Sequence, residues 1–181
     1  MTRITRNQES MFKIEKNYIK NHKEIINYVE SRNFVFKHRS SPRSTAKTSS
    51  FMTCPGVTLK SKMGNSDFYT LFNEDMDDHL LNLILENVPK QLAITNKFIQ
   101  IQKYNPGNYI LPHKDFQNRI SKLHMYTLTT SDHDGLVCEC NDKYILIPDE
   151  GGQYIDGTTA MFNWHWVNPV RKLRYSMVIG V

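Results

Sequence analysis

The chain has 181 residues, 39% of them hydrophobic and 23% charged, with a formal net charge of +5 at pH 7. This length fits one domain, and this balance of apolar and charged residues excludes an intrinsically disordered chain. The sequence has no apolar run of membrane-spanning length, no apolar stretch of a secretory signal near its start and only three cysteines, so we expect a cytoplasmic protein with no membrane partner and no disulfide framework.

The first half of the chain carries two helical patterns. Apolar residues recur at helical spacing over about 11–29, which predicts an amphipathic helix. Asp75–Val88 begins with acidic side chains, is apolar in its middle and is followed by Pro89, which predicts a second helix. Phe34–Phe36 favours the start of a short strand.

A basic segment lies between these two helices. Residues 31–66 contain seven Lys and Arg side chains and no Asp or Glu. From His38 to Asn65 the segment is polar, irregular and punctuated by Pro and Gly, as binding loops and lids often are. We expect it to cover the functional site when substrate binds, with its charge favouring an acidic peptide or a nucleic acid. The alternative is a surface loop whose charges only aid solubility.

After Lys97 the pattern changes to short β-prone runs separated by turn signals, which predicts a β-sandwich or barrel buttressed by the two helices. We expect a single domain over 1–181, with the helices and basic loop in 1–96 and a β core that carries the site in 97–181. The runs predicted as strands are KFIQIQKY, YILPHKDF, KLHMYTLT, LVCEC, KYILIP, TTAMFNW and RYSMVIGV, and the segments predicted as turns include SDHDG and DEGG.

His113 and Asp115 are the first candidate site residues. On an extended chain, residues two apart point to the same face, so an imidazole and a carboxylate would aim at the same space, as two ligands of one metal must. Taken alone, the pair His-x-Asp is equally compatible with an incidental surface loop. A Cys-x-Cys metal site at Cys138 and Cys140 is a weaker alternative, because no further ligands cluster near it in the sequence.

His165 and Arg174 strengthen the metal hypothesis. His165 lies in the aromatic segment FNWHWVNPV, and Arg174 lies in the apolar run LRYSMVIGV. A buried arginine is costly unless it meets an anion. Two histidines and one carboxylate form the facial triad of iron(II) oxygenases, and an arginine beyond the second histidine can hold the distal carboxylate of a chelating keto acid.

From about Lys97 to Val181 the sequence resembles the iron(II)/2-oxoglutarate-dependent dioxygenases, especially their prolyl-hydroxylase-like branch. Lys122-Leu123-His124 is similar instead to the Arg-x-His of aspartyl/asparaginyl hydroxylases, so the branch and the substrate stay open. The blocks that carry the resemblance are Tyr104-Asn-Pro-Gly-Asn-Tyr109, Pro112-His113-Lys-Asp115-Phe116, Asp156-Gly157-Thr-Thr-Ala-Met-Phe162, His165-Trp-Val-Asn-Pro169-Val170 and Arg174-Tyr175-Ser176.

The resemblance implies a mainly β fold with flanking α-helices, the double-stranded β-helix or jelly roll. It also implies an enzyme that uses Fe(II), 2-oxoglutarate and O2, with ascorbate in a supporting role, and that releases succinate and CO2. The implied substrate is a prolyl or other amino-acid residue in a peptide or protein, or a free amino acid. The implied metal ligands are His113, Asp115 and His165.

The contacts expected for 2-oxoglutarate are Arg174, Tyr104, His124 and Tyr126. Arg171 competes with Arg174 as the anchor, but it lies in a predicted turn rather than in the apolar strand. On the strand KLHMYTLT, His124 and Tyr126 share one face, which either lines the pocket or faces water.

Two other functions stay open. A nucleic-acid (nucleobase) oxygenase or demethylase with the same iron site is favoured by the basic segment 31–66, but enzymes of that kind resemble a pattern with a later second arginine, and none follows Arg174 here. The other is a metal-free jelly-roll binding module in which the histidines and the aspartate are structural. The sequence does not predict the oligomeric state.

Overall fold

The computed structural model describes residues 2–3, 13–39, 66–96, 98–113, 122–140, 143–157 and 164–181. Its helices are α2 (His22–Ser31), the 3-10 helix η3 (Asn73–Asp75), α3 (Asp78–Leu85) and α4 (Lys90–Thr95). Its strands are β1 (Thr2–Arg3), β2 (Ile14–Glu15), β3 (Lys37–Arg39), β4 (Phe68–Phe72), β5 (Phe98–Tyr104), β6 (Ile110–His113), β7 (Leu123–Thr127), β8 (Ser131–Cys140), β9 (Lys143–Asp149), β10 (Gln153–Asp156), β11 (His165–Val167) and β12 (Arg174–Gly180). Within these ranges, no helix has the length and apolar character that a membrane crossing requires.

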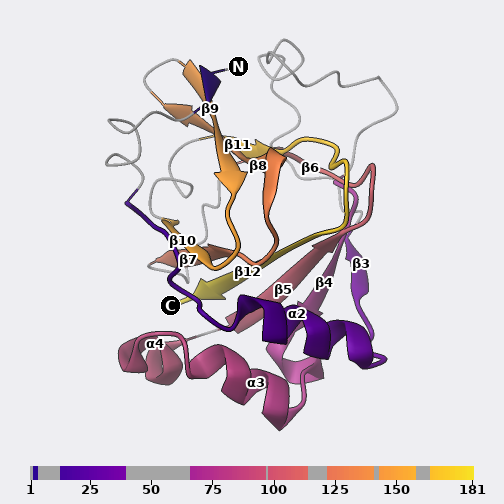
Figure 1. Ribbon diagram of the computed structural model, residues 1–181, viewed down its shortest axis with the longest axis vertical. Coiled ribbons are helices and arrows are strands. Elements are labelled where there is room, and N and C mark those ends of the chain that lie inside the picture. Colours follow the sequence, from indigo (N-terminus) through magenta and orange to yellow (C-terminus); the bar gives the residue numbers. More distant parts are fainter. Residues whose placement is uncertain are drawn as a thin grey trace.

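The strands form two sheets that face each other (Figure 1). The smaller sheet has the order β1-β9-β8-β11-β6, and the larger has the order β2-β10-β7-β12-β5-β4-β3. From β5 to β8 and again from β9 to β12, successive strands alternate between the two sheets. Wherever two of the strands from β5 to β12 are hydrogen-bonded neighbours in a sheet, they run antiparallel. This is the connectivity of a jelly roll.

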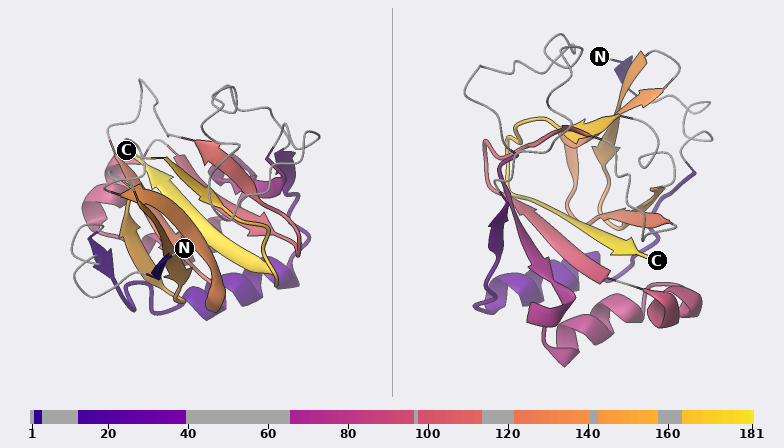
Figure 2. Two further views of the ribbon diagram at one scale, coloured as in Figure 1. Left: turned by 90° about the horizontal axis from the view of Figure 1, so that it is seen from above. Right: turned by 180° about the vertical axis from the view of Figure 1, so that it is seen from behind.

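The helices cover the outer face of the larger sheet, as both views in Figure 2 show. Their apolar side chains, including Ile25 of α2 and Leu80 of α3, pack with Ile101 of β5 and Met177 of β12 in one buried cluster. Both faces of the larger sheet are therefore buried, one under the helices and one against the smaller sheet. This explains why β12 is buried at every position instead of alternating.

The two predicted helices are present but shorter than expected. α3 begins after Asp77, whose carboxylate accepts a hydrogen bond from the Leu80 amide at 2.9 Å and so caps the helix. The first helix was predicted over about 11–29, but α2 starts only at His22. Ile14 and Glu15 instead pair with β10, because an exposed sheet edge offers the backbone hydrogen bonds that a helix would have provided.

The strand predictions hold for β5, β7, β9 and β12. The turn predicted at 131–135 is wrong, since these polar residues form the first half of β8, where the pairing with β9 shifts register between Ser131 and Gly135. β10 was not among the predicted strands, and of the run 158–164, which was predicted as a strand, only Trp164 is described. Most of the predicted lid, His38–Asn65, also lies outside the described residues.

Candidate functional site

Two histidines meet on the inner side of the smaller sheet. His113 ends β6, His165 begins β11, and the two residues are direct partners in the antiparallel register of these strands. Their ring centroids are 4.2 Å apart, and both residues are buried. Two imidazoles at this separation, carried by adjacent strands, can bind one metal ion.

The hydrogen bond of His113 determines which of its ring nitrogens can bind a metal. Its Nδ1 lies 2.7 Å from the carbonyl oxygen of Leu111. A carbonyl oxygen only accepts, so Nδ1 carries the hydrogen and Nε2 is the basic nitrogen of the neutral ring. A backbone carbonyl that orients a metal-binding histidine in this way is a common feature of metal sites.

Asp115, the predicted third ligand, lies in 114–121, outside the described residues. Among the residues that are described, no group of three His, Cys, Asp or Glu side chains is placed to hold a metal. Cys138, part of the alternative metal site, is buried with apolar neighbours in the core between the sheets. The structure thus brings together the two predicted histidine ligands.

A cavity of about 370 Å³ extends between the sheets, and both histidines line it. Its walls on the larger sheet are residues of alternating positions, as the period of a strand requires. At one end lie Gln102, Tyr104, Arg174 and Ser176. The cavity therefore joins the histidine pair to a polar end that contains a buried cation.

Arg174 is 4% exposed and forms a two-point ion pair with Asp149. Its Nε donates to Asp149 Oδ2 at 2.6 Å, and its Nη2 donates to Asp149 Oδ1 at 3.0 Å. Burial raises the pKa of Asp149, although the charge of Arg174 opposes that shift. Burial lowers the pKa of Arg174 while the Asp149 carboxylate raises it, and the carboxylate prevails, so the guanidinium stays charged.

Four further contacts define the polar end of the cavity. The Arg174 guanidinium lies over the Tyr104 ring, 4.8 Å from its centroid, and Nη1 donates to Ser176 Oγ at 3.3 Å. Gln102 Oε1 accepts hydrogen bonds from the Tyr104 hydroxyl at 2.8 Å and from Ser176 Oγ at 3.1 Å. Donors gathered in this way can bind a carboxylate.

Sequence reasoning assigned no site role to Gln102, Ser176 or Asp149, although Ser176 is part of the block Arg174-Tyr175-Ser176. A signal for the first two existed, because Gln102 is two residues before Tyr104 and Ser176 two residues after Arg174, so each shares a strand face with a predicted contact. No local signal pointed to Asp149, which is 25 residues from Arg174 in the sequence.

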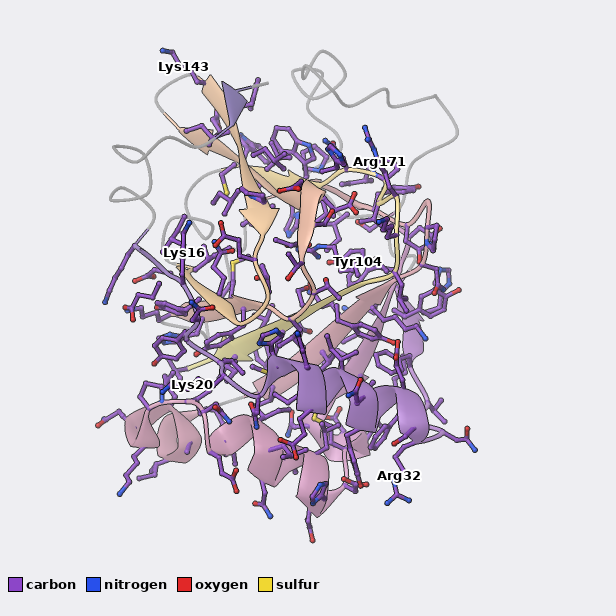
Figure 3. The ribbon with its side chains drawn as sticks, in the orientation of Figure 1. Lys16, Lys20, Arg32, Tyr104, Lys143 and Arg171 are labelled. Carbon is purple, nitrogen blue, oxygen red and sulfur yellow. The ribbon has the colours of Figure 1, made fainter. Side chains whose placement is uncertain are left out.

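Arg171, the competing anchor, is exposed and does not line the cavity. Figure 3 shows its side chain at the edge of the molecule, apart from Tyr104. Of the two arginines, Arg174 is the one placed to meet a ligand inside the β core.

The structure corrects the expectation for His124 and Tyr126. Leu123, Met125 and Thr127 line the cavity, whereas His124 does not and instead contacts the Tyr154 hydroxyl through Nδ1 at 3.2 Å. Tyr126 borders the cavity, but its ring packs against Tyr18 and Tyr154 on the outer side of the sheet. These side chains lie on the outer face of β7 because side chains alternate along a strand. N-terminal segments, including Tyr18, cover this face, so it is not open to water.

The opposite end of the cavity is mainly apolar. Phe98, Leu123, Val178 and Met125 form a separate cluster there. Arg39, Phe72 and Glu74 also line this part, with the Arg39 guanidinium 5.6 Å from the Phe72 ring centroid. This end can receive an apolar group together with charged groups of either sign.

No protein-family model matches this sequence, and the comparison with curated proteins gives no significant match. Solved structures do match. A prolyl-4-hydroxylase from Pseudomonas putida aligns with a TM-score of 0.58 at 11% identity, over 96% of this chain and 94% of that chain. The viral collagen prolyl hydroxylase from Paramecium bursaria Chlorella virus-1, in complex with 2-oxoglutarate, aligns with a TM-score of 0.54 at 12% identity, over 92% and 93% of the two chains.

A third similar structure is an oxidoreductase of the 2-oxoglutarate-Fe(II) oxygenase family from Burkholderia pseudomallei. It aligns with a TM-score of 0.51 at 16% identity, over 63% of this chain and 68% of that chain. At these identities the likeness concerns the fold. The chain adopts the double-stranded β-helix of the 2-oxoglutarate-Fe(II) oxygenases, which confirms the predicted mainly β jelly roll.

Proposed function

We propose that this protein is an iron(II)- and 2-oxoglutarate-dependent oxygenase. The observation that carries the proposal is a single cavity with two adjacent buried histidines on one wall and a buried arginine at one end. Such an arrangement suits a keto acid that chelates a metal at one end and presents a carboxylate at the other.

His113, Asp115 and His165 would hold the metal. They are the two-histidine, one-carboxylate set that leaves further positions of an iron(II) ion for the keto acid and O2. Bound iron would supply the chemistry by which O2 oxidises 2-oxoglutarate to succinate and CO2 and hydroxylates the substrate. The protein keeps His113 in the metal-binding tautomer through the Leu111 carbonyl.

Arg174 would bind the distal carboxylate of 2-oxoglutarate. Its Nη1 already donates to Ser176, and Gln102 and Tyr104 complete the hydrogen-bond network there. Because these groups are buried, a carboxylate bound there is shielded from water, which strengthens its charge-assisted hydrogen bonds. His124 is no longer among the proposed contacts.

For the substrate we propose a prolyl or other amino-acid residue of a peptide or protein, or a free amino acid. The apolar end of the cavity, with Phe98 and Val178, would hold an aliphatic side chain or ring. Two of the similar structures are named as prolyl hydroxylases, which supports the same class. Arg39, which lines the cavity together with Glu74, can pair with an acidic group of such a substrate.

A nucleobase oxygenase is the second candidate. Lys37 and Arg39 lie in the basic segment that favours it, but Lys37 forms an ion pair with Asp75 at 2.6 Å, and Glu74 also lines the cavity. A polyanion would meet mixed charges at this rim, so we rank the amino-acid substrate higher. A metal-free binding module is the third candidate, and metal analysis distinguishes it from both enzymes.

The decisive experiment measures succinate release with Fe(II), 2-oxoglutarate and O2 against peptides, free amino acids and oligonucleotides. His113→Ala, Asp115→Ala and His165→Ala should each abolish turnover and leave the β circular-dichroism signal intact. The exposed residues Asp132 and His133 offer matched controls, so Asp132→Asn and His133→Ala should retain activity. Wild-type turnover by Asp115→Ala would disprove the ligand assignment.

A further inference from the structure

The buried arginine at the polar end of the cavity already has a carboxylate partner from its own chain. Asp149, the last residue of β9, has no exposed side-chain area and does not line the cavity. It therefore contacts Arg174 from behind and leaves the space of a cavity ligand open. A carboxylate with two hydrogen bonds to a guanidinium holds both its position and its plane.

Asp149 determines which edge of the guanidinium faces the cavity. A guanidinium has five N–H groups, and Asp149 accepts one from Nε and one from Nη2. Nη1 points instead to Ser176, which lines the cavity. The remaining contacts of Arg174 are to neutral groups, the Tyr104 side chain and Ser176 Oγ at 3.3 Å, and hydrogen bonds to neutral partners are weaker than those to a carboxylate.

We propose, on the premise that 2-oxoglutarate binds here, that Asp149 is a positioning residue that fixes how far the Arg174 guanidinium reaches into the cavity. The histidine pair marks the other end of the keto acid. The distance between these two fixed points then selects the length of the dicarboxylate. Asp149 thereby makes the site specific for one chain length among oxo acids that carry the same charge.

Positioning must be separated from two other effects of Asp149. Its charge repels any bound carboxylate, and its ion pair stabilises the fold. The repulsion weakens the binding of 2-oxoglutarate and of its longer homologue 2-oxoadipate by similar factors, because both are dianions. The ratio of their dissociation constants therefore cancels the effect of charge and reports geometry, while the melting temperature reports the contribution to the fold.

The test is calorimetric titration of the full chain without O2, with Mn(II) replacing iron, using 2-oxoglutarate and then 2-oxoadipate. We expect the wild-type protein to prefer 2-oxoglutarate by roughly tenfold or more, the value of one charge-assisted hydrogen bond. Asp149→Asn keeps the shape but loses one acceptor, and this preference should fall at least about threefold. Asp156→Asn, which removes a Lys122 ion pair away from the cavity, is the control and should leave both constants unchanged.

Asp149→Glu keeps the ion pair if Asp149→Asn does not fold. One added methylene pushes the guanidinium toward the histidines and shortens the site. The affinity for the four-carbon oxaloacetate should therefore rise relative to the affinity for 2-oxoglutarate. The positioning role would be overturned if Asp149→Asn changed the dissociation constants of 2-oxoglutarate and 2-oxoadipate by the same factor. It would also be overturned if Asp149→Glu left the ratio of the constants for oxaloacetate and 2-oxoglutarate unchanged. Failure of the wild-type protein to bind 2-oxoglutarate at all would instead refute the proposed function, and the inference with it.

Discussion

Arg174 is a full positive charge in the interior of the β core, and its neighbours make that burial tolerable. The two-point ion pair with Asp149 offsets the loss of hydration, and the Tyr104 ring adds a cation–π contact. Removing one member of such a buried pair costs about 3–5 kcal/mol, because the other charge stays without compensation. Variants of Arg174 that test ligand binding must therefore keep a hydrogen-bond donor.

Arg174→Gln keeps an amide donor but loses the positive charge and the paired N–H groups with which a guanidinium holds both oxygens of a carboxylate. We expect it to weaken 2-oxoglutarate binding by about 2–3 kcal/mol, the value of a charge-assisted two-point contact. Arg171 is exposed, so the same substitution there, Arg171→Gln, should change the free energy of 2-oxoglutarate binding by no more than about 0.5 kcal/mol. Titration of both variants with 2-oxoglutarate and Mn(II) measures this, and the reverse ranking would transfer the anchor to Arg171.

At the scale of the element, β7 divides two environments. Its inner face lines the cavity and its outer face packs under the N-terminal segments, where burial lowers the pKa of His124 from its ordinary value of 6.5. The charges of Lys122 and Lys13 lower it further, against Asp156. Since the folded-state pKa is below the unfolded one, the unfolded chain binds the extra proton. The resulting stability is complete above pH 6.5 and is lost as the pH falls through the folded-state pKa.

We therefore expect the melting temperature of the wild-type protein to fall more steeply than that of His124→Gln between about pH 7 and about pH 5. The other histidines are the same in both proteins, so any effect of theirs cancels in the difference. Scanning calorimetry at several pH values measures it. Parallel pH profiles for the two proteins would show that His124 does not contribute.

The end of β12 is packed closely against β5. A Cβ added at Gly180 would lie 2.3 Å from Phe98 Cε1, so the phenyl ring would have to move. Because that ring is partly exposed, we expect Gly180→Ala to cost only about 1 kcal/mol, the lower end of the overpacking range. In urea unfolding, adding Phe98→Leu should recover part of the loss. Strict additivity of the two changes would contradict this contact.

At the scale of the whole molecule, two sheets enclose a cavity and helices support one of them. Ligands that bind only the folded state must stabilise it. A keto acid and metal at 100 times their dissociation constant add about 2.7 kcal/mol. For a chain of this size that corresponds to a rise of roughly 5–10 °C in the melting temperature. Thermal shift with Mn(II) and 2-oxoglutarate measures it, and the doubly neutralised Asp149→Asn/Arg174→Gln variant should show much less.

The sequence alone determined the class of fold and the outline of the site. β5, β7, β9 and β12 followed from short apolar runs between turn signals, because strand patterns are local. His113 and Asp115 were predicted from their spacing, and His165 and Arg174 from an aromatic or apolar setting in which a polar or charged side chain is costly, while the family resemblance implied their roles. Asp115 lies outside the described residues.

Only the tertiary structure decided which strand faces meet. The alternation in β7 indicates two different faces, but it does not say which one lines the cavity when both are buried, so His124 was assigned to the wrong side. The local sequence could not predict the pairing of Arg174 with Asp149 either, because this ion pair joins strands of opposite sheets that are far apart in the sequence. A periodic pattern records that a side chain is buried, whereas its partner depends on how the whole chain closes around the core.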